Sequence, residues 1–210
     1  FLRDYMSRNV AGFVEGTLNP DSFIVFTAHY DHLGRMGAKV LFPGANDNAS
    51  GVAMLVSLAR YYTQVKNLPR YSVAFIAFGG EEAGLAGSEY YTRHPLFPLK
   101  NIAFLVNLDI VGTGDEGITV VNGTELPEEF ARLASCNRRN GYLPDVAARD
   151  KAKNSDHYYF TEAGVKAFFI YTRGGSKAYH DIYDRAETLP LTKFQELFWL
   201  LLDFVDELTG

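Results

Sequence analysis

Cysteine is almost missing from this sequence, because Cys136 is the single one among 210 residues. One cysteine forms no internal disulfide and builds no cysteine-ligated zinc site. Positive charge is also scarce: 20 Lys and Arg stand against 25 Asp and Glu, for a net charge of -5, and they form no basic run. This balance argues against a nucleic-acid partner. No apolar stretch approaches the ~18 residues of a membrane-spanning helix, so we expect no membrane span.

The composition favours a globular domain with a substantial core, since hydrophobic residues make up 47% and aromatic residues 14% of the chain. The length suits one large domain, and we expect residues 1–210 to form a single domain. The sequence begins with Phe1 rather than Met and shows no signal peptide, which predicts a chain that lacks an N-terminal segment. Residues 1–8 resemble the tail of an upstream helix.

Short apolar runs alternate with amphipathic segments along the chain, which predicts an α/β fold. We expect strands at 10–16, 23–28, 73–78, 101–109, 118–121 and 166–171, and helices at 48–62, 88–93, 126–140, 155–163 and 191–208. The first two strands flank the turn signal Asn19-Pro20-Asp21 and are expected to pair as a hairpin. The prediction is a three-layer α/β sandwich, with helices on both faces of a mixed, mostly parallel sheet.

The stretch Tyr71 to Glu82 joins a buried strand to two acids. Its apolar run ends at Gly79-Gly80, and Glu81 and Glu82 follow at once. Ligands of open α/β sheets bind beyond the carboxyl ends of the strands. Alone, such a pair of acids is more often a solvated helix start, so the prediction of a site depends on other segments.

Four other segments place a metal-binding side chain after a strand or in a loop, and with Glu82 they give five candidate ligands: His29, Asp47, Glu82, Asp109 and His180. Zinc binds both imidazole nitrogen and carboxylate oxygen. A pair of ions about 3.5–4 Å apart needs a bridging carboxylate. With one ligand shared, each ion receives one histidine, one carboxylate and one oxygen of the bridge.

Charge compensation supports the cluster, because three neighbouring carboxylates cannot all stay ionised without cations. Two dications balance three carboxylates and one bridging hydroxide. Glu81 is then left over and is free to act as a base. Asp31 lies two residues after His29 and is predicted to accept a hydrogen bond from its second ring nitrogen. Asp184 is a weaker candidate for the same role at His180.

These motifs resemble, in order, the co-catalytic zinc aminopeptidases of the M28 peptidase family. The matching segments run from about Asn9 onward: His29-Tyr30-Asp31, the box from Gly44 to Gly51, Gly80-Glu81-Glu82 with Gly84 and Gly87, Asn107-Leu108-Asp109, Ser155-Asp156-His157 and Tyr179-His180. The resemblance implies two zinc ions, one held by His29 and Asp109 and the other by Glu82 and His180, with Asp47 as the bridge. It also implies a cis peptide bond after Asp47.

The implied activity is hydrolysis of the first residue from peptides with a free N-terminus, through a metal-bridging hydroxide. Glu81 would be the general base and then the general acid, and Tyr179 either helps to hold the oxyanion or is simply packed. An apolar first side chain would enter a pocket lined by Met36, Val40, Leu41 and Phe42 with Tyr158 and Phe160. The same loop residues equally suit packing of the loop itself.

Three alternatives stay open. A single-zinc glutaminyl-peptide cyclase has a similar fold and carboxylate pair but departs from the intact box at 44–51. A catalytically dead interaction domain of this fold would have lost ligands, and a related carboxypeptidase would bring an Arg-rich second domain. Because members of the family are commonly exported, we expect an extracytoplasmic location.

Overall fold

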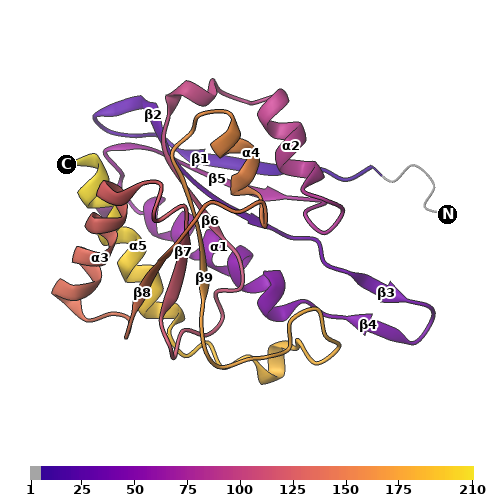
Figure 1. Ribbon diagram of the computed structural model, residues 1–210. Helices are drawn as coiled ribbons and strands as arrows, with labels where there is room; N and C mark the ends of the chain where they lie inside the picture. Colours follow the sequence, from indigo (N-terminus) through magenta and orange to yellow (C-terminus); the bar gives the residue numbers. More distant parts are fainter. Residues whose placement is uncertain (1–5) are drawn as a thin grey trace.

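The computed structural model describes residues 6–210 (Figure 1). The helix tail expected at residues 1–8 lies mostly outside the described residues, and residues 6–9 form no helix. The strands are β1 (Val10–Val14), β2 (Asn19–His29), β3 (Gly34–Met36), β4 (Val40–Phe42), β5 (Tyr71–Phe78), β6 (Ile102–Leu108), β7 (Ile118–Val121), β8 (Val146–Arg149) and β9 (Ala167–Thr172). The α-helices are α1 (Ser50–Tyr62), α2 (Ala86–Arg93), α3 (Pro127–Asn140), α4 (His157–Glu162) and α5 (Phe194–Thr209).

Seven strands form one mixed sheet in the order β1-β5-β2-β6-β9-β7-β8. The central strands β5, β2, β6 and β9 run parallel, whereas β1 pairs antiparallel with β5 and β7 antiparallel with β9. The predicted α/β fold with a mixed, mostly parallel sheet is therefore confirmed. Strand β8, which extends the sheet beyond β7, was not predicted because 146–149 is short and contains only one large apolar residue, Val146.

The predicted hairpin between the first two strands is wrong, because β5 lies between them and pairs with both. The connection from β1 to β2 reverses the chain direction around β5 and forms no tight hairpin turn. Its backbone N–H groups at Thr17, Leu18 and Asn19 donate instead to the carbonyls of Pro69 and Arg70, just before β5. The turn residues Asn19 and Pro20 begin the long strand β2.

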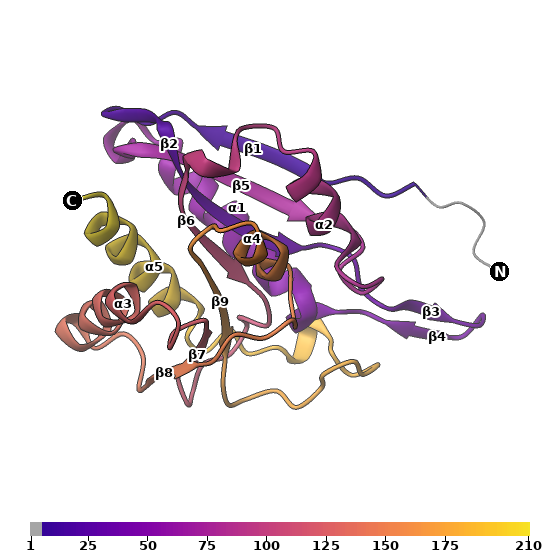
Figure 2. The ribbon, with the colours of Figure 1, turned by 45° about the horizontal axis from the view of Figure 1, so that its top comes forward.

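Helices cover both faces of the sheet, as the two views show (Figures 1 and 2): α1, α3 and α5 lie on one face, and α2 and α4 on the other. The side chains of β2 alternate accordingly. Ile24 and Phe26 join the core under α1, α3 and α5, whereas Phe23 and Val25 join the core under α2 and α4. Period-two alternation with both sets buried explains why the run reads as continuously apolar.

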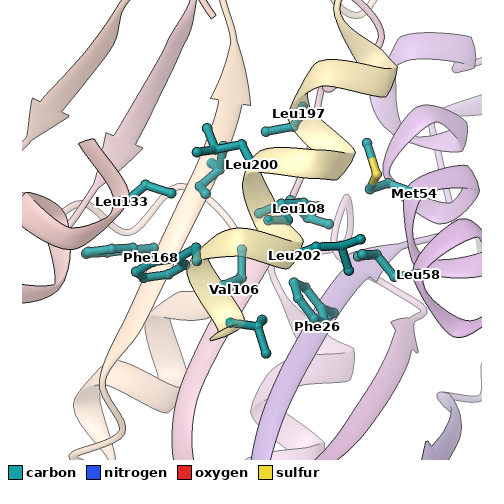
Figure 3. Close-up of a cluster of buried hydrophobic side chains, with 14 of the residues drawn as sticks. Phe26, Met54, Leu58, Val106, Leu108, Leu133, Phe168, Leu197, Leu200 and Leu202 are labelled. Carbon is teal, nitrogen blue, oxygen red and sulfur yellow. The ribbon is translucent and has the colours of Figure 1, made fainter. Parts of the chain in front are cut away.

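The larger core centres on α5, which packs between α1 and α3 over the strands (Figure 3). Leu197 and Leu200 of this helix are completely buried. Burying side chains of this size is worth about 1.5–3 kcal/mol each, so α5 fastens the carboxyl-terminal segment to the sheet. Within residues 6–210, no helix has both the length and the apolarity needed to cross a membrane.

Helix α1 approaches the end of β6 so closely that its second residue has to be glycine. A Cβ on Gly51 would lie 2.5 Å from the carbonyl oxygen of Leu108 and 2.3 Å from Oδ1 of Asn48. This close approach brings the segment before α1 against the segment after β6. Those two segments carry Asp47 and Asp109.

Replacing Gly51 by Ala is expected to lower the free energy of unfolding by roughly 1–3 kcal/mol, because the added methyl group overpacks this contact. Urea denaturation measures the change. Gly12→Ala is the matched control, since a Cβ at Gly12 meets nothing within 4 Å. A Gly51→Ala protein as stable as the Gly12→Ala protein would show that the two segments are not in tight contact.

Candidate metal centre

The first histidine group lies at the ends of β2 and β6. Nε2 of His29 is 3.3 Å from Oδ1 of Asp47 and 3.3 Å from Oδ1 of Asp109. All three side chains are buried. Zinc-bound N and O atoms at bonds of about 2.0–2.1 Å in a tetrahedral site lie roughly 3.3–3.4 Å apart. The spacing of these three atoms suits one zinc ion.

The second histidine group forms on the other side of Asp47. Nε2 of His180 is 3.2 Å from Oδ2 of Asp47 and 3.4 Å from Oε2 of Glu82. The loop after β9 brings in His180, which has a positive φ of 51°. All five predicted ligands therefore meet in one place, and the two oxygens of Asp47 face different histidines.

Asp184 fixes the loop that carries Asp47. Its Oδ1 accepts a hydrogen bond of 2.8 Å from the backbone N–H of Asn46, and its Oδ2 accepts one of 3.0 Å from that of Asp47. The expectation that Asp184 orients His180 is wrong, because its carboxylate bonds these two backbone donors and makes no hydrogen bond to His180 in the described residues. The expected cis peptide between Asp47 and Asn48 is confirmed.

The polar residues of the box from Gly44 to Gly51 hold this loop against the segment after β6. Asn48 Nδ2 donates to the carbonyl of Leu108, Asn46 Oδ1 accepts from the N–H of Gly112, and Ser50 Oγ accepts from that of Val111. These bonds span 60 or more residues in sequence. The box thus fixes the position of Asp47 relative to Asp109.

A buried chain of hydrogen bonds orients Asp109. Ser155 Oγ donates to Asp109 Oδ2 at 3.0 Å and accepts from Asn107 Nδ2 at 2.8 Å, and Asn107 Oδ1 accepts from Thr27 Oγ1 at 2.7 Å. The chain occupies Oδ2 and leaves Oδ1 facing His29. Hydrogen bonds of this kind hold metal-binding carboxylates in a fixed rotamer.

Asp31 acts differently from the prediction. The ring Nδ1 of His29 lies 3.0 Å from the backbone carbonyl of Asp31 and 3.8 Å from its carboxylate. Strand β2 ends at His29, so the shared-face geometry of a strand does not extend to Asp31. Its carboxylate instead accepts the backbone N–H groups of Glu81 and Glu82, at 3.1 and 3.2 Å, and so positions the pair of glutamates.

Glu81 faces the cluster without belonging to either group of ligand atoms. Burial raises the pKa of its carboxyl to about 8, and the negative charges of Asp156, Asp109 and Glu82 add to this although His29 opposes it. Asp156 is a member of the site that the ligand spacing did not reveal. It is completely buried, and burial raises its pKa to about 7.

Tyr179 stacks on His180, with ring centroids 4.0 Å apart and an interplanar angle of 17°. Its ring is mostly exposed. Burial and the charge of Asp47 raise the pKa of its hydroxyl. Together with Asp47, Ile110 and Ala178 it lines a small recess of about 40 Å³. Its place beside the acids is therefore established, whereas its role stays a prediction.

The pocket predicted for an apolar side chain is wrong in part. Phe160 is a residue of α4 and is completely buried against Phe78 and Tyr91. The long loop contains the unpredicted hairpin β3–β4, which extends away from the sheet (Figures 1 and 2). Met36 at its tip end is 68% exposed.

His32 also reaches the cluster, although its position in the sequence gave no ligand spacing. Its Nδ1 lies 2.8 Å from Oε1 of Glu82 and 3.9 Å from Oδ2 of Asp47. The signal available in the sequence was its place three residues after His29, at the start of the long loop. His32, Asp47 and Glu82 have their ligand atoms within 4.8 Å of one another, and His180 lies 3.2 and 3.4 Å from the same two acids.

The donors present fit a pair of zinc ions. Several of the converging atoms are buried and have no hydrogen-bond partner within residues 6–210: His29 Nε2, Asp47 Oδ2, Glu82 Oε1 and Asp109 Oδ1. Burial opposes a positive charge on His29, yet Asp109 and Asp47 raise its pKa to about 12. The acids thus demand cationic compensation, which metal ions provide.

Comparison with known proteins gives one consistent family. The profile described as Peptidase family M28 matches residues 9–205. Aminopeptidase YwaD of Bacillus subtilis is 32% identical over 201 residues, which are 90% of this chain and 42% of that protein. A protein of Leptosphaeria maculans described as a probable zinc metalloprotease is 39% identical over 157 residues, 70% of this chain and 36% of that one. The chain spans less than half the length of these relatives.

Solved structures agree with this result. BSAP, a zinc aminopeptidase from Bacillus subtilis, superposes with a TM-score of 0.78 at 28% identity over 95% of this chain and 49% of that one. A glutaminyl cyclase of Bacteroides thetaiotaomicron has the same TM-score at 21% identity, over 94% of this chain and 76% of that one. At that identity the second likeness concerns the fold alone.

Asp184→Ala is expected to lower the free energy of unfolding by about 2 kcal/mol or more, because it leaves two buried N–H groups without acceptors. Denaturation in the presence of a chelator measures this without a contribution from metal. Asp21→Ala removes an exposed carboxylate and should change stability by no more than ~0.5 kcal/mol. Equal stability of the two variants would contradict the assigned bonds.

The stability of chelated protein is expected to fall as the pH rises from 5 to 8. The folded-state pKa values of Glu81 (about 8) and Asp156 (about 7) lie above the ordinary carboxyl values of 4.5 and 3.8. The folded state therefore binds more protons than the unfolded state in this window, and deprotonation costs stability. His29 acts in the same direction, since its raised pKa gives stability below 6.5 that is lost toward about 12.

Urea denaturation at several pH values, with chelator or with saturating zinc, measures this dependence. Zinc should flatten or reverse the slope, because metal binding needs deprotonated ligands. Asp156→Asn should weaken the slope in chelator. A chelated protein whose stability rises over this pH window would contradict the assignment.

Proposed function

Because the chain belongs to peptidase family M28, we propose that it is the catalytic part of a zinc-dependent aminopeptidase with two metal ions. The observation that carries the proposal is the arrangement around Asp47. One of its oxygens lies 3.3 Å from Nε2 of His29 and the other 3.2 Å from Nε2 of His180. A carboxylate that faces two imidazoles in this way suits a bridge between two ions.

In this proposal His29 and Asp109 would hold one zinc ion, His180 and Glu82 would hold the other, and both ions would share Asp47. When bound, the zinc pair would supply Lewis acidity to the peptide carbonyl and lower the pKa of a water molecule toward about 7. The protein residues must then hold the peptide, orient it and move one proton.

Glu81 suits the transfer of that proton. It lies next to Glu82, and Asp31 holds both backbone N–H groups. Its ionised carboxylate would accept a proton from the attacking water and return it to the leaving amine. Burial raises the pKa of Glu81 to about 8, and the positive charge of a bound zinc pair would oppose this shift. The carboxylate form would then be available as a general base near neutral pH.

The acids also explain why the substrate would need a free N-terminus, because a cluster rich in carboxylates attracts an ammonium group. For the first side chain we favour an apolar residue, since Ile110, Ala178 and Tyr179 line one part of the small recess beside Asp47, whereas Asn46, Asp47 and Ser176 line the rest. In this proposal the hydroxyl of Tyr179, whose ring stacks on His180, donates its hydrogen to the substrate oxygen. This donor would stabilise charge that develops during attack.

Glu81→Gln is expected to lower kcat by about 10²–10⁴-fold, the usual contribution of a positioned proton-transfer group. Its zinc content should stay at the wild-type value, because Glu81 is not among the proposed ligands. Glu125→Gln, at an exposed position, is the matched control. Assays on an aminoacyl nitroanilide with metal analysis measure both effects, and an active Glu81→Gln protein would remove the base assignment.

Activity on free but not on N-acetylated aminoacyl nitroanilides is expected, with apolar residues preferred over acidic ones. Acetylation removes the ammonium group while it leaves the scissile bond in place. Peptides with N-terminal glutamine, analysed for pyroglutamate, test the alternative cyclase reaction. Cleavage of the acetylated substrates, or pyroglutamate as the sole product, would overturn the proposal.

A further inference from the structure

The side chain of His32 lies beside the second histidine group and has no assigned task. It follows β2 by three residues, and only 8% of its side chain is exposed. Its Nδ1 is 2.8 Å from Oε1 of Glu82. A buried imidazole this close to a proposed zinc ligand is either a further ligand or a group that orients the ligand.

The distances separate these two roles. Nitrogen and oxygen ligands of one tetrahedral zinc lie roughly 3.3–3.4 Å apart at bonds of about 2.0–2.1 Å. His180 meets this spacing, at 3.2 Å from Asp47 and 3.4 Å from Glu82. His32 does not, since its Nδ1 is 3.9 Å from Asp47 and 2.8 Å from Glu82. A separation of 2.8 Å is the length of a charge-assisted hydrogen bond.

The two histidines also face different oxygens of Glu82. His180 lies near Oε2, whereas His32 lies near Oε1. Neither Oε1 of Glu82 nor Nδ1 of His32 has a hydrogen-bond partner in the described part of the chain. A buried donor and a buried acceptor left unpaired are costly, and at 2.8 Å these two atoms are within hydrogen-bond distance of each other.

The ring of His32 has little freedom to move elsewhere. A Cβ on Gly44 would lie 2.6 Å from Cγ and 2.8 Å from Cδ2 of His32, so the ring packs directly on the Gly44 backbone. Gly44 has a positive φ of 67°, which glycine adopts without strain. The ring of His180 is 5.8 Å away at 64°. The imidazole is thus confined beside Glu82.

We propose that His32 is a positioning residue: its Nδ1–H donates to Oε1 of Glu82 and leaves Oε2 directed at the second zinc. This inference rests on the two-zinc function proposed above. The hydrogen bond fixes the carboxylate rotamer of Glu82 before metal arrives. It thereby raises the affinity of the ion that Glu82 and His180 hold.

Four variants test this role: His32→Ala, His32→Asn, His180→Ala and the control His94→Ala at an exposed position. The amide nitrogen of Asn takes nearly the same place as Nδ1 of His and keeps the donor. Competition with a chromophoric chelator gives the dissociation constant of each zinc ion. The visible absorption of the cobalt-substituted protein reports the number and kind of ligands.

His32→Ala should lower the affinity for the second zinc ion by about 10–100-fold, the usual effect of losing a group that orients a metal ligand. His32→Asn should restore most of the affinity, and both should keep the wild-type cobalt spectrum. His180→Ala should change that spectrum, and His94→Ala should change neither quantity. Circular dichroism in chelator shows that each variant is folded.

Unchanged affinity of the second ion in His32→Ala would overturn the inference and leave the two-zinc function intact. A changed cobalt spectrum in His32→Ala that Asn does not restore would also overturn it, since it would make His32 a ligand. A wild-type protein that binds fewer than two ions would overturn the proposed function itself.

Discussion

The structure depends on gathering mutually repelling acids around two imidazoles at one edge of the sheet. Asp47, Glu82 and Asp109 lie within 3.2–3.4 Å of His29 or His180, in surroundings where an uncompensated charge is costly. The fold meets this cost with a rigid frame rather than with exposure to solvent. Parallel strands bring their carboxyl ends to one edge, and the box at 44–51 is bonded to the segment after β6.

Much of this arrangement was predictable, because strand ends are visible in a sequence. Apolar runs that stop at His29, Asp109 or the glycines before Glu82 indicate both the strand and the edge to which it delivers a side chain. Parallel order then brings those side chains together without knowledge of any contact. The prediction of five convergent ligands used this logic together with a family resemblance, and the structure brings all five together.

The predictions that were wrong or missing have a different physical origin. The tasks of Asp31, Asp184 and His32 depend on loop geometry, where no periodicity constrains the direction of a side chain. Asp31 bonds the backbone of Glu81 and Glu82 instead of the His29 ring, and Asp184 bonds the Asp47 loop across 137 residues of sequence. The hairpin of β1 and β2 failed for a related reason: a local turn signal says nothing of a distant strand that inserts between its neighbours.

The place of Asp184, four residues after His180, has a consequence for how this segment tolerates change. One short stretch delivers an imidazole to the metal cluster and a carboxylate to the amides of Asn46 and Asp47. Both ends are anchored to the same loop, so the chain length between them is fixed. Insertions or deletions at 181–183 would pull one anchor away, whereas the tip of the β3–β4 hairpin carries no such restriction on its length.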